Sequence, residues 1–114
     1  MARVLLIEDQ DIVNRMLCDA LRHQGHQADC VKTKAEAERA LASTSYTLII
    51  ANVVLPDGSG RDVARIAEDK GAKTLLMTGH PDEAQALEIQ KITHLRKPFG
   101  IADFEKMVRD RLGA

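Results

Sequence analysis

Short apolar runs alternate with longer amphipathic stretches along the 114 residues of the chain. The first run, Val4–Ile7, is rich in strand-forming side chains and stops at an acidic pair. From Ile12 to Leu21 the apolar residues then recur at helical spacing, and Gly25 ends that pattern. This order of a strand followed by a helix recurs along the rest of the chain. Further strands are predicted over residues 27–31, 47–51, 74–77 and 93–96, each followed by a helical pattern.

Turn and capping residues separate these elements. Thr33 and Glu36 have the spacing at which side chains satisfy free amides at a helix start, so a second helix is predicted to about Ser43. The turn 56–60 precedes a third helix that ends near Gly71, and a fourth helix starts near Pro81. Consecutive strand–helix units of this length form a parallel sheet covered by helices on both faces. We therefore expect one α/β domain over residues 1–114, a flavodoxin-like three-layer sandwich with strand order 2-1-3-4-5.

Composition narrows the range of partners. Sixteen basic and seventeen acidic residues give a net charge of −1, so the whole chain has no field that would attract nucleic acid or an anionic membrane. No stretch resembles a signal peptide or a membrane span, which predicts a cytoplasmic protein. Cys18 and Cys30 lack the spacing of a zinc or redox motif, and we expect both to be buried, reduced thiols.

Polar side chains follow four of the five predicted strands. Glu8 and Asp9 follow the first strand, Asn52 the third, Thr78 the fourth and Lys97 the fifth. In an open parallel sheet of this order the ligand site lies outside the carboxyl ends of the strands, so these side chains should meet in one crevice. Carboxylate and amide oxygens suit Mg²⁺, while a hydroxyl and an ammonium group suit phosphoryl oxygens. Each residue alone has a plainer role in capping a helix or facing solvent.

Four motifs in order make the chain similar to the receiver domains of two-component response regulators. They are Leu5–Asp9 with its acid pair, Val54–Gly60 with its proline turn, Leu76–Gly79 with its hydroxyl, and Arg96–Phe99 with its Lys-Pro-Phe element. The resemblance covers essentially the whole length. It implies a module of phosphorelay signalling, not an enzyme, that contacts a histidine kinase or phosphotransfer protein. It also allows a homodimer.

The resemblance assigns roles to individual residues. Mg²⁺ would be bound by Glu8, Asp9, the residue at position 52 and the backbone carbonyl of Val54, while Thr78 and Lys97 would sense the phosphoryl group. His94 takes the place of the aromatic residue that moves when the domain switches. The resemblance also implies a docking surface for the kinase, at Ile12, Asn14, Arg15 and Pro98. Among these, Ile12 lies at the edge of an apolar arc wider than a core contact needs, so it is expected to be exposed.

The family's phosphoacceptor is an aspartate four residues before the proline of the turn, and here that position is Asn52. A neutral amide is a poor nucleophile, so we expect no acyl phosphate at Asn52 and weaker Mg²⁺ binding. Two origins stay open: a natural pseudo-receiver that signals by protein contact, or an ordinary receiver whose aspartate has been replaced. Either way, the resemblance places no output domain within these 114 residues.

Two rivals from other classes fit the residues less well. A flavin-binding flavodoxin needs a Ser/Thr/Gly-rich phosphate loop after the first strand and aromatic rings around the flavin, but the chain has no Trp and one Tyr. A Mg²⁺-dependent aspartyl-phosphate hydrolase would need its nucleophile at the first strand, where Asp9 is the candidate, and a cap domain for which the chain is short.

Overall fold

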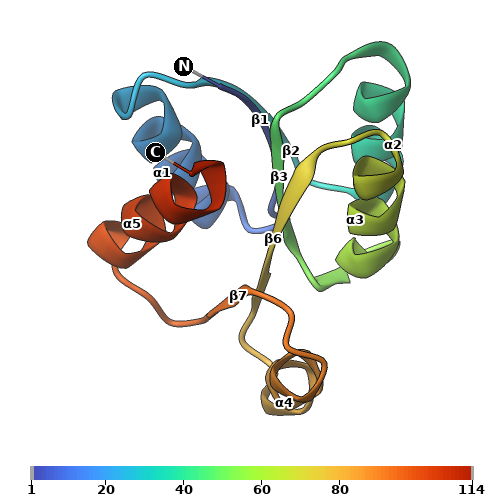
Figure 1. The fold of residues 1–114 in the computed structure, drawn as a ribbon, viewed down its shortest axis with the longest axis vertical. Helices are drawn as coiled ribbons and strands as arrows, with labels where there is room; N and C mark the ends of the chain where they lie inside the picture. Colours follow the sequence, from blue (N-terminus) through green and yellow to red (C-terminus); the bar gives the residue numbers. More distant parts are fainter. Residues whose placement is uncertain (1, 114) are drawn as a thin grey trace.

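The computed structural model describes residues 2–113 and contains a five-stranded parallel sheet of order β2-β1-β3-β6-β7 (Figure 1). This is the predicted flavodoxin-like order 2-1-3-4-5, because β4 and β5 form a separate hairpin. The strands of the main sheet are β1 (Arg3–Ile7), β2 (Gln27–Val31), β3 (Leu48–Asn52), β6 (Lys73–Thr78) and β7 (His94–Arg96).

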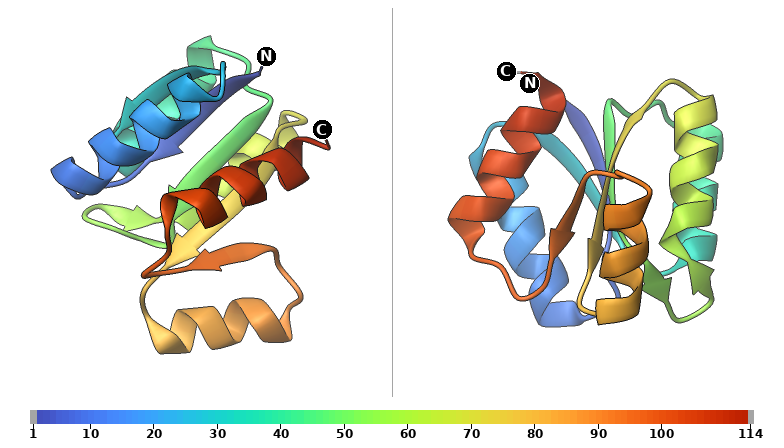
Figure 2. Two further views of the ribbon diagram at one scale, coloured as in Figure 1. Left: turned by 90° about the vertical axis from the view of Figure 1, so that its left-hand side faces the viewer. Right: turned by 60° about the horizontal axis from the view of Figure 1, so that its bottom comes forward.

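Between residues 2 and 113 the structure has five helices, and Figures 1 and 2 show how they surround the sheet. They are α1 (Asp11–His23), α2 (Lys34–Ser43), α3 (Gly60–Asp69), α4 (Pro81–Ile89) and α5 (Ile101–Leu112). Helices α1 and α5 lie side by side on one face, and α2 and α3 lie on the other. The edge strand β2 is next to β1, and α1 packs across this edge of the sheet.

Side chains of the central strands alternate between two apolar cores. In β1, Val4 and Leu6 face α1 and α5, while Leu5 and Ile7 face α2, α3 and α4. All five residues of β3 are buried, which explains why this strand is a continuous apolar run in the sequence. Phe104 of α5 is completely buried in the first core. The two cores fix the sheet between its helix layers and leave its carboxyl ends open at one edge.

A small hairpin follows β3 where the sequence indicates only a turn. Strands β4 (Val54–Leu55) and β5 (Gly58–Ser59) pair antiparallel and lead into α3. A Cβ atom at Gly60 would lie 1.8 Å from the backbone oxygen of Asn52, so only glycine allows this approach. Gly60 N also donates to Val53 O at 2.8 Å. The hairpin is thereby pinned against the end of β3.

The predicted state of the cysteines is wrong, because Cys18 of α1 and Cys30 of β2 form a disulfide. The expected helix and strand positions are confirmed, and Cys18 is buried, but both sulfurs are paired. Their Cα atoms are 6.3 Å apart, within the range that a disulfide spans. The reason lies in tertiary packing: α1 lies across the edge strand, a proximity that local spacing does not show.

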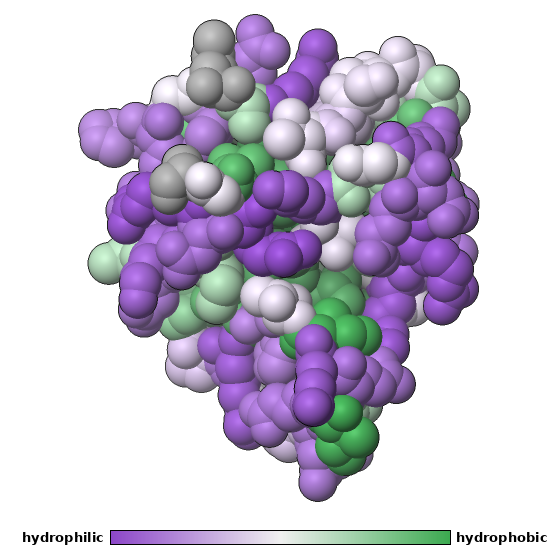
Figure 3. Space-filling view, viewed as in Figure 1, coloured by the Kyte–Doolittle hydropathy of each residue, from purple (hydrophilic) through white to green (hydrophobic). Residues whose placement is uncertain are grey.

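The surface seen in Figure 3 is largely hydrophilic, with an apolar spot over α4, the helix that carries the 73% exposed Ile89. Within residues 2–113, every helix is too short or too polar to cross a bilayer.

Candidate functional site

The five polar residues predicted from the strand ends lie together at the carboxyl ends of the strands. Glu8 and Asp9 follow β1, Asn52 and Thr78 end β3 and β6, and Lys97 follows β7. A pocket at these strand ends is lined by Asp9, Gln10, Asn52, Val54, Met77, Thr78, Gly79, His80 and Lys97. Glu8 is completely buried beneath the pocket.

The Glu8 carboxylate is held by three donors. Lys97 Nζ lies 2.5 Å from Glu8 Oε1, and the backbone amide of Gln10 donates to Oε2 at 3.0 Å. Asn52 Nδ2 also donates to Oε2, at 2.7 Å. Burying a carboxylate costs free energy unless it is paired and hydrogen bonded, and these three contacts satisfy that need. The Gln10 amide is a contact that the sequence pattern did not indicate.

The Asn52 amide joins the two acids. Its Nδ2 donates to Glu8 Oε2 and, at 2.9 Å, to Asp9 Oδ1. The opposite orientation of the amide would set Oδ1 against two carboxylates, so the electrostatics favour the orientation observed. Asn52 Oδ1 is buried without a hydrogen-bond partner in the described part of the chain. The amide therefore offers its positive edge to the acids and leaves its oxygen unsatisfied.

The arrangement does not fit a divalent cation as it stands. Mg²⁺ would need oxygens from Glu8, Asp9 and Asn52 to converge, but an N–H group lies between the two acids. Both oxygens of Glu8 already accept hydrogen bonds. Among residues 2–113 no cluster of three His, Cys, Asp or Glu side chains has the geometry to hold a metal. Binding of Mg²⁺ would require the Asn52 side-chain amide to flip, so that its oxygen faces the two acids.

The remaining site residues surround the pocket. Thr78 is 3% exposed, and its Oγ1 accepts from the backbone amide of His80 at 3.1 Å. The side chain of Val54 is half-exposed at the rim. His94 is half-buried on β7, with Nδ1 2.9 Å from Ile92 O. The structure brings Thr78, Val54 and Lys97 together around Asn52, while His94 does not line the pocket.

Three of the four predicted docking residues are exposed, and one is not. Ile12 is 77% exposed, and Arg15 and Pro98 also face solvent. The prediction for Asn14 is wrong, because Asn14 is buried and its Nδ2 donates to Glu8 O at 2.9 Å and Val31 O at 3.0 Å. Asn14 therefore ties α1 to the ends of β1 and β2 and takes no part in an exposed surface.

Comparison with known proteins identifies the family. The profile of the response regulator receiver domain matches residues 4–109, which is nearly the whole chain. The chain belongs to this family. It is a receiver domain of two-component signal transduction, and receiver domains are signalling modules. It is 30% identical over 112 residues to the response regulator protein PmrA of Pseudomonas aeruginosa, a match covering 94% of this chain and 51% of that protein.

Other relatives agree with this assignment. The transcriptional regulatory protein PmrA of Pectobacterium parmentieri is 28% identical over 112 residues, which cover 94% of this chain and 50% of the relative. The receiver domain thus spans about half the length of the curated relatives it matches. Among solved structures, the non-phosphorylated HemR receiver domain from Leptospira biflexa aligns with a TM-score of 0.85 at 24% identity, covering 100% of this chain and 96% of that one. This likeness shows the fold.

Proposed function

We propose that this receiver domain signals by protein contact without accepting a phosphoryl group at residue 52. The observation that supports the proposal is the Asn52 amide, which lies at the end of β3 and donates to Glu8 and Asp9. In this position an aspartate would attack phosphorus through a carboxylate oxygen, a reaction that the neutral amide cannot perform at ordinary pH.

The Asn52 amide and the Lys97 ammonium reduce the repulsion between the two carboxylates, which a bound cation would otherwise reduce. Two carboxylates in a desolvated crevice repel each other unless positive groups lie between or beside them. Here the Asn52 N–H groups lie between Glu8 and Asp9, and the Lys97 ammonium pairs with Glu8. The two acids are already satisfied by the protein's own side chains, so we expect weak Mg²⁺ binding and a fixed conformation near that of an unphosphorylated receiver.

The expected partner is a histidine kinase or a phosphotransfer protein. An apolar groove next to the site pocket runs between α1 and the segment after β7, and includes Val13, Met16, Pro98, Phe99 and Ile101. Ile12 and Met16 on α1 are exposed beside it. A groove of this kind suits the apolar face of an amphipathic helix. We place this interaction in the cytoplasm. A homodimer is a second contact that this chain could make, and we expect the chain itself not to bind nucleic acid.

Phosphorylation can be tested directly. The chain is incubated with acetyl phosphate and Mg²⁺, or with a cognate kinase and ATP, and its intact mass is measured. We expect no phosphoryl adduct on the chain as it stands. The matched variant Asn52→Asp is expected to gain an adduct, because it returns the nucleophile to a site that keeps Thr78 and Lys97.

Three results would contradict the proposal. An adduct mapped to Asp9 would move the acceptor to β1, and turnover of a phosphate ester by the unmodified chain would favour the hydrolase reading. An adduct at residue 52 of the unmodified chain would contradict the chemistry outright. If Asn52→Asp stays unmodified, the site has lost phosphotransfer for reasons beyond residue 52.

A further inference from the structure

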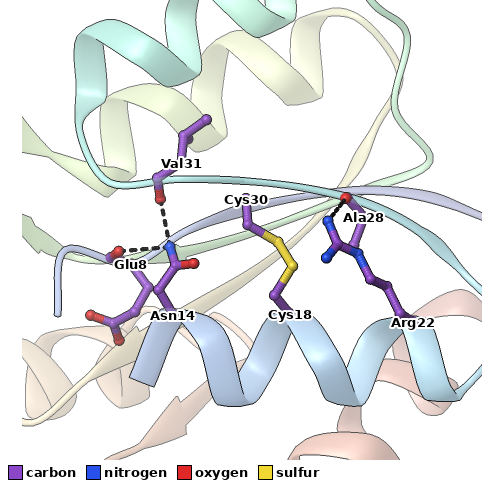
Figure 4. The surroundings of a disulfide bond; sticks show 7 residues. All are labelled: Glu8, Asn14, Cys18, Arg22, Ala28, Cys30 and Val31. Carbon is purple, nitrogen blue, oxygen red and sulfur yellow. Dashed lines mark hydrogen bonds between the residues drawn. A yellow bond between two sulfur atoms is a disulfide. The ribbon is translucent and has the colours of Figure 1, made fainter. Parts of the chain in front are cut away.

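A disulfide joins α1 to the edge strand β2, and neither of its cysteines lines the site pocket. Figure 4 shows the bond between Cys18 and Cys30, with Asn14 and Arg22 on the same side of α1. Cys18 is 5% exposed and Cys30 is half-buried. Because β2 is an edge strand with a neighbour on one side only, solvent reaches it more readily than it reaches the central strands.

Two hydrogen-bonded contacts flank the disulfide, one helical turn away on each side. Asn14 Nδ2 donates to Val31 O at 3.0 Å, and Arg22 Nη2 donates to Ala28 O at 3.0 Å (Figure 4). Residues 14, 18 and 22 are four apart and lie on one face of the helix. They contact β2 in reverse order of its sequence. Neither hydrogen bond involves a sulfur atom, so reduction of the disulfide removes neither of them directly, and we expect both to persist.

We propose that Cys18 and Cys30 form a reversible thiol–disulfide site that exchanges with small-molecule thiols and clamps α1 onto β2 when oxidised. A reversible pair needs the reduced fold to hold two thiols within bonding reach. Here Asn14 and Arg22 provide that support, with the two Cα atoms 6.3 Å apart. Disulfides inside cells are usually transient. In the cytoplasm proposed above, the bond is therefore expected to form and break.

The reaction is a two-electron exchange with a low-molecular-weight disulfide. The thiolate of Cys30, the more exposed residue, attacks one sulfur of that disulfide and releases one thiol, which leaves a mixed disulfide on Cys30. The thiolate of Cys18 then attacks Cys30 Sγ, forms the intramolecular bond and releases the second thiol. The protein loses two protons and two electrons, and the small disulfide is reduced to two thiols. Reduction runs through the same steps in reverse.

The consequence concerns the helix that carries the exposed Ile12. Asn14 connects the first turn of α1 to the backbone of Glu8, so the position of α1 is linked to the end of β1. Oxidation adds a covalent link one turn further along the same helix. The oxidised clamp should therefore reduce local opening of α1 and β2, whereas the reduced form keeps the fold through Asn14 and Arg22.

The test is a titration of the folded chain in glutathione buffers of increasing oxidised-to-reduced ratio. Free thiols are trapped by alkylation and counted by intact mass. We expect a reversible transition from two alkylated thiols to none, without a lasting mixed disulfide. Hydrogen exchange of the β2 and α1 amides should slow on oxidation. The variant Cys30→Ser should stay folded and show no such dependence on the glutathione ratio.

A matched pair of variants tests the role of the flanking contacts. Asn14→Ala removes two hydrogen bonds from α1, one to Val31 O on β2 and one to Glu8 O after β1, and we expect the equilibrium to shift about tenfold toward the thiols. Gln24→Ala removes a hydrogen bond from the end of α1 to Glu105 O on α5, and should leave the equilibrium unchanged. Equal shifts of the thiol–disulfide equilibrium in both variants would overturn the role of the flanking hydrogen bonds. Thiols that stay reduced at every ratio, or a disulfide that opens only in denaturant, would overturn the proposal, and neither result depends on phosphorylation at residue 52.

Discussion

Replacing Asn52 by aspartate should destabilise the domain in the absence of divalent cations. The substitution removes two hydrogen bonds to carboxylates, at 2.7 and 2.9 Å, and puts a third carboxylate in their place. A hydrogen bond to a charged group contributes about 1.5 to 3 kcal/mol, so losing both costs about 3 kcal/mol or more. Two unit charges about 4 Å apart near a protein surface add repulsion of about 4 kcal/mol before the groups relax or take up a proton. We therefore expect a loss of about 3 kcal/mol at neutral pH as a lower estimate.

Urea unfolding in EDTA and in Mg²⁺ measures this effect. With a slope of about 1.5 kcal/mol per molar urea, the midpoint of Asn52→Asp should fall by about 2 M in EDTA. Mg²⁺ at ten times its dissociation constant for the variant should raise the variant's free energy of unfolding by about 1.4 kcal/mol. The same Mg²⁺ concentration should raise that of the unchanged chain much less. The control is Gln85→Glu, which adds the same charge at an exposed position of α4 and should change stability by less than about 0.5 kcal/mol. Equal stability of Asn52→Asp and the unchanged chain in EDTA would refute the reasoning, as would an equal gain from Mg²⁺ in both.

Two further predictions concern the surface. Ile12→Asp should weaken binding to the helices of a cognate kinase about tenfold, with little change in stability. The control Ile89→Asp changes a similarly exposed isoleucine on α4 and should leave kinase binding unchanged. An unfolded Ile12→Asp protein would place Ile12 in the core instead. Asp57→Ala should increase hydrogen exchange in the first turn of α2, because Asp57 accepts from the amides of Lys34 and Ala35 at 2.8 and 3.0 Å; unchanged exchange would show that the hairpin does not cap α2.

Much of the fold followed from the sequence because its signals are local or repeat with a regular period. The apolar run of β3 and the Thr33 cap both appear where the sequence predicts them, the latter with Thr33 Oγ1 accepting from Glu36 N. The convergence of Glu8, Asn52 and Lys97 followed from one rule about the ends of parallel strands. The rule needs the strand order, and the alternation of strands and helices restricts that order to a few parallel arrangements.

The errors come from contacts between elements. The resemblance placed Asn14 on the docking surface, yet it precedes the buried Leu17 and Cys18 by three and four residues and shares their inward face. That spacing was the signal that could have placed it inside. The disulfide from Cys18 to Cys30 had no such signal, since it depends on how α1 lies across β2. The orientation of the Asn52 amide also depends on neighbours that only the folded chain supplies.

The alkaline titration of Tyr46 provides an independent test of packing far from the site. Tyr46 is buried, and its hydroxyl donates to Asp29 Oδ2 at 2.7 Å. Burial first and then the Asp29 carboxylate raise the pKa of Tyr46 to about 12. Because this pKa is raised above the unfolded value of about 10, its contribution to stability is complete below about pH 10 and is lost as the pH rises toward 12.

The chain has one tyrosine and no tryptophan, so the ultraviolet absorbance of the phenolate reports this group alone. We expect a midpoint near pH 12 in the folded chain and, in urea, about 10. Asp29→Asn should lower the folded midpoint by removing the negative charge. A midpoint near 10 while circular dichroism still shows a folded chain would mean that the hydroxyl is neither buried nor bonded to Asp29.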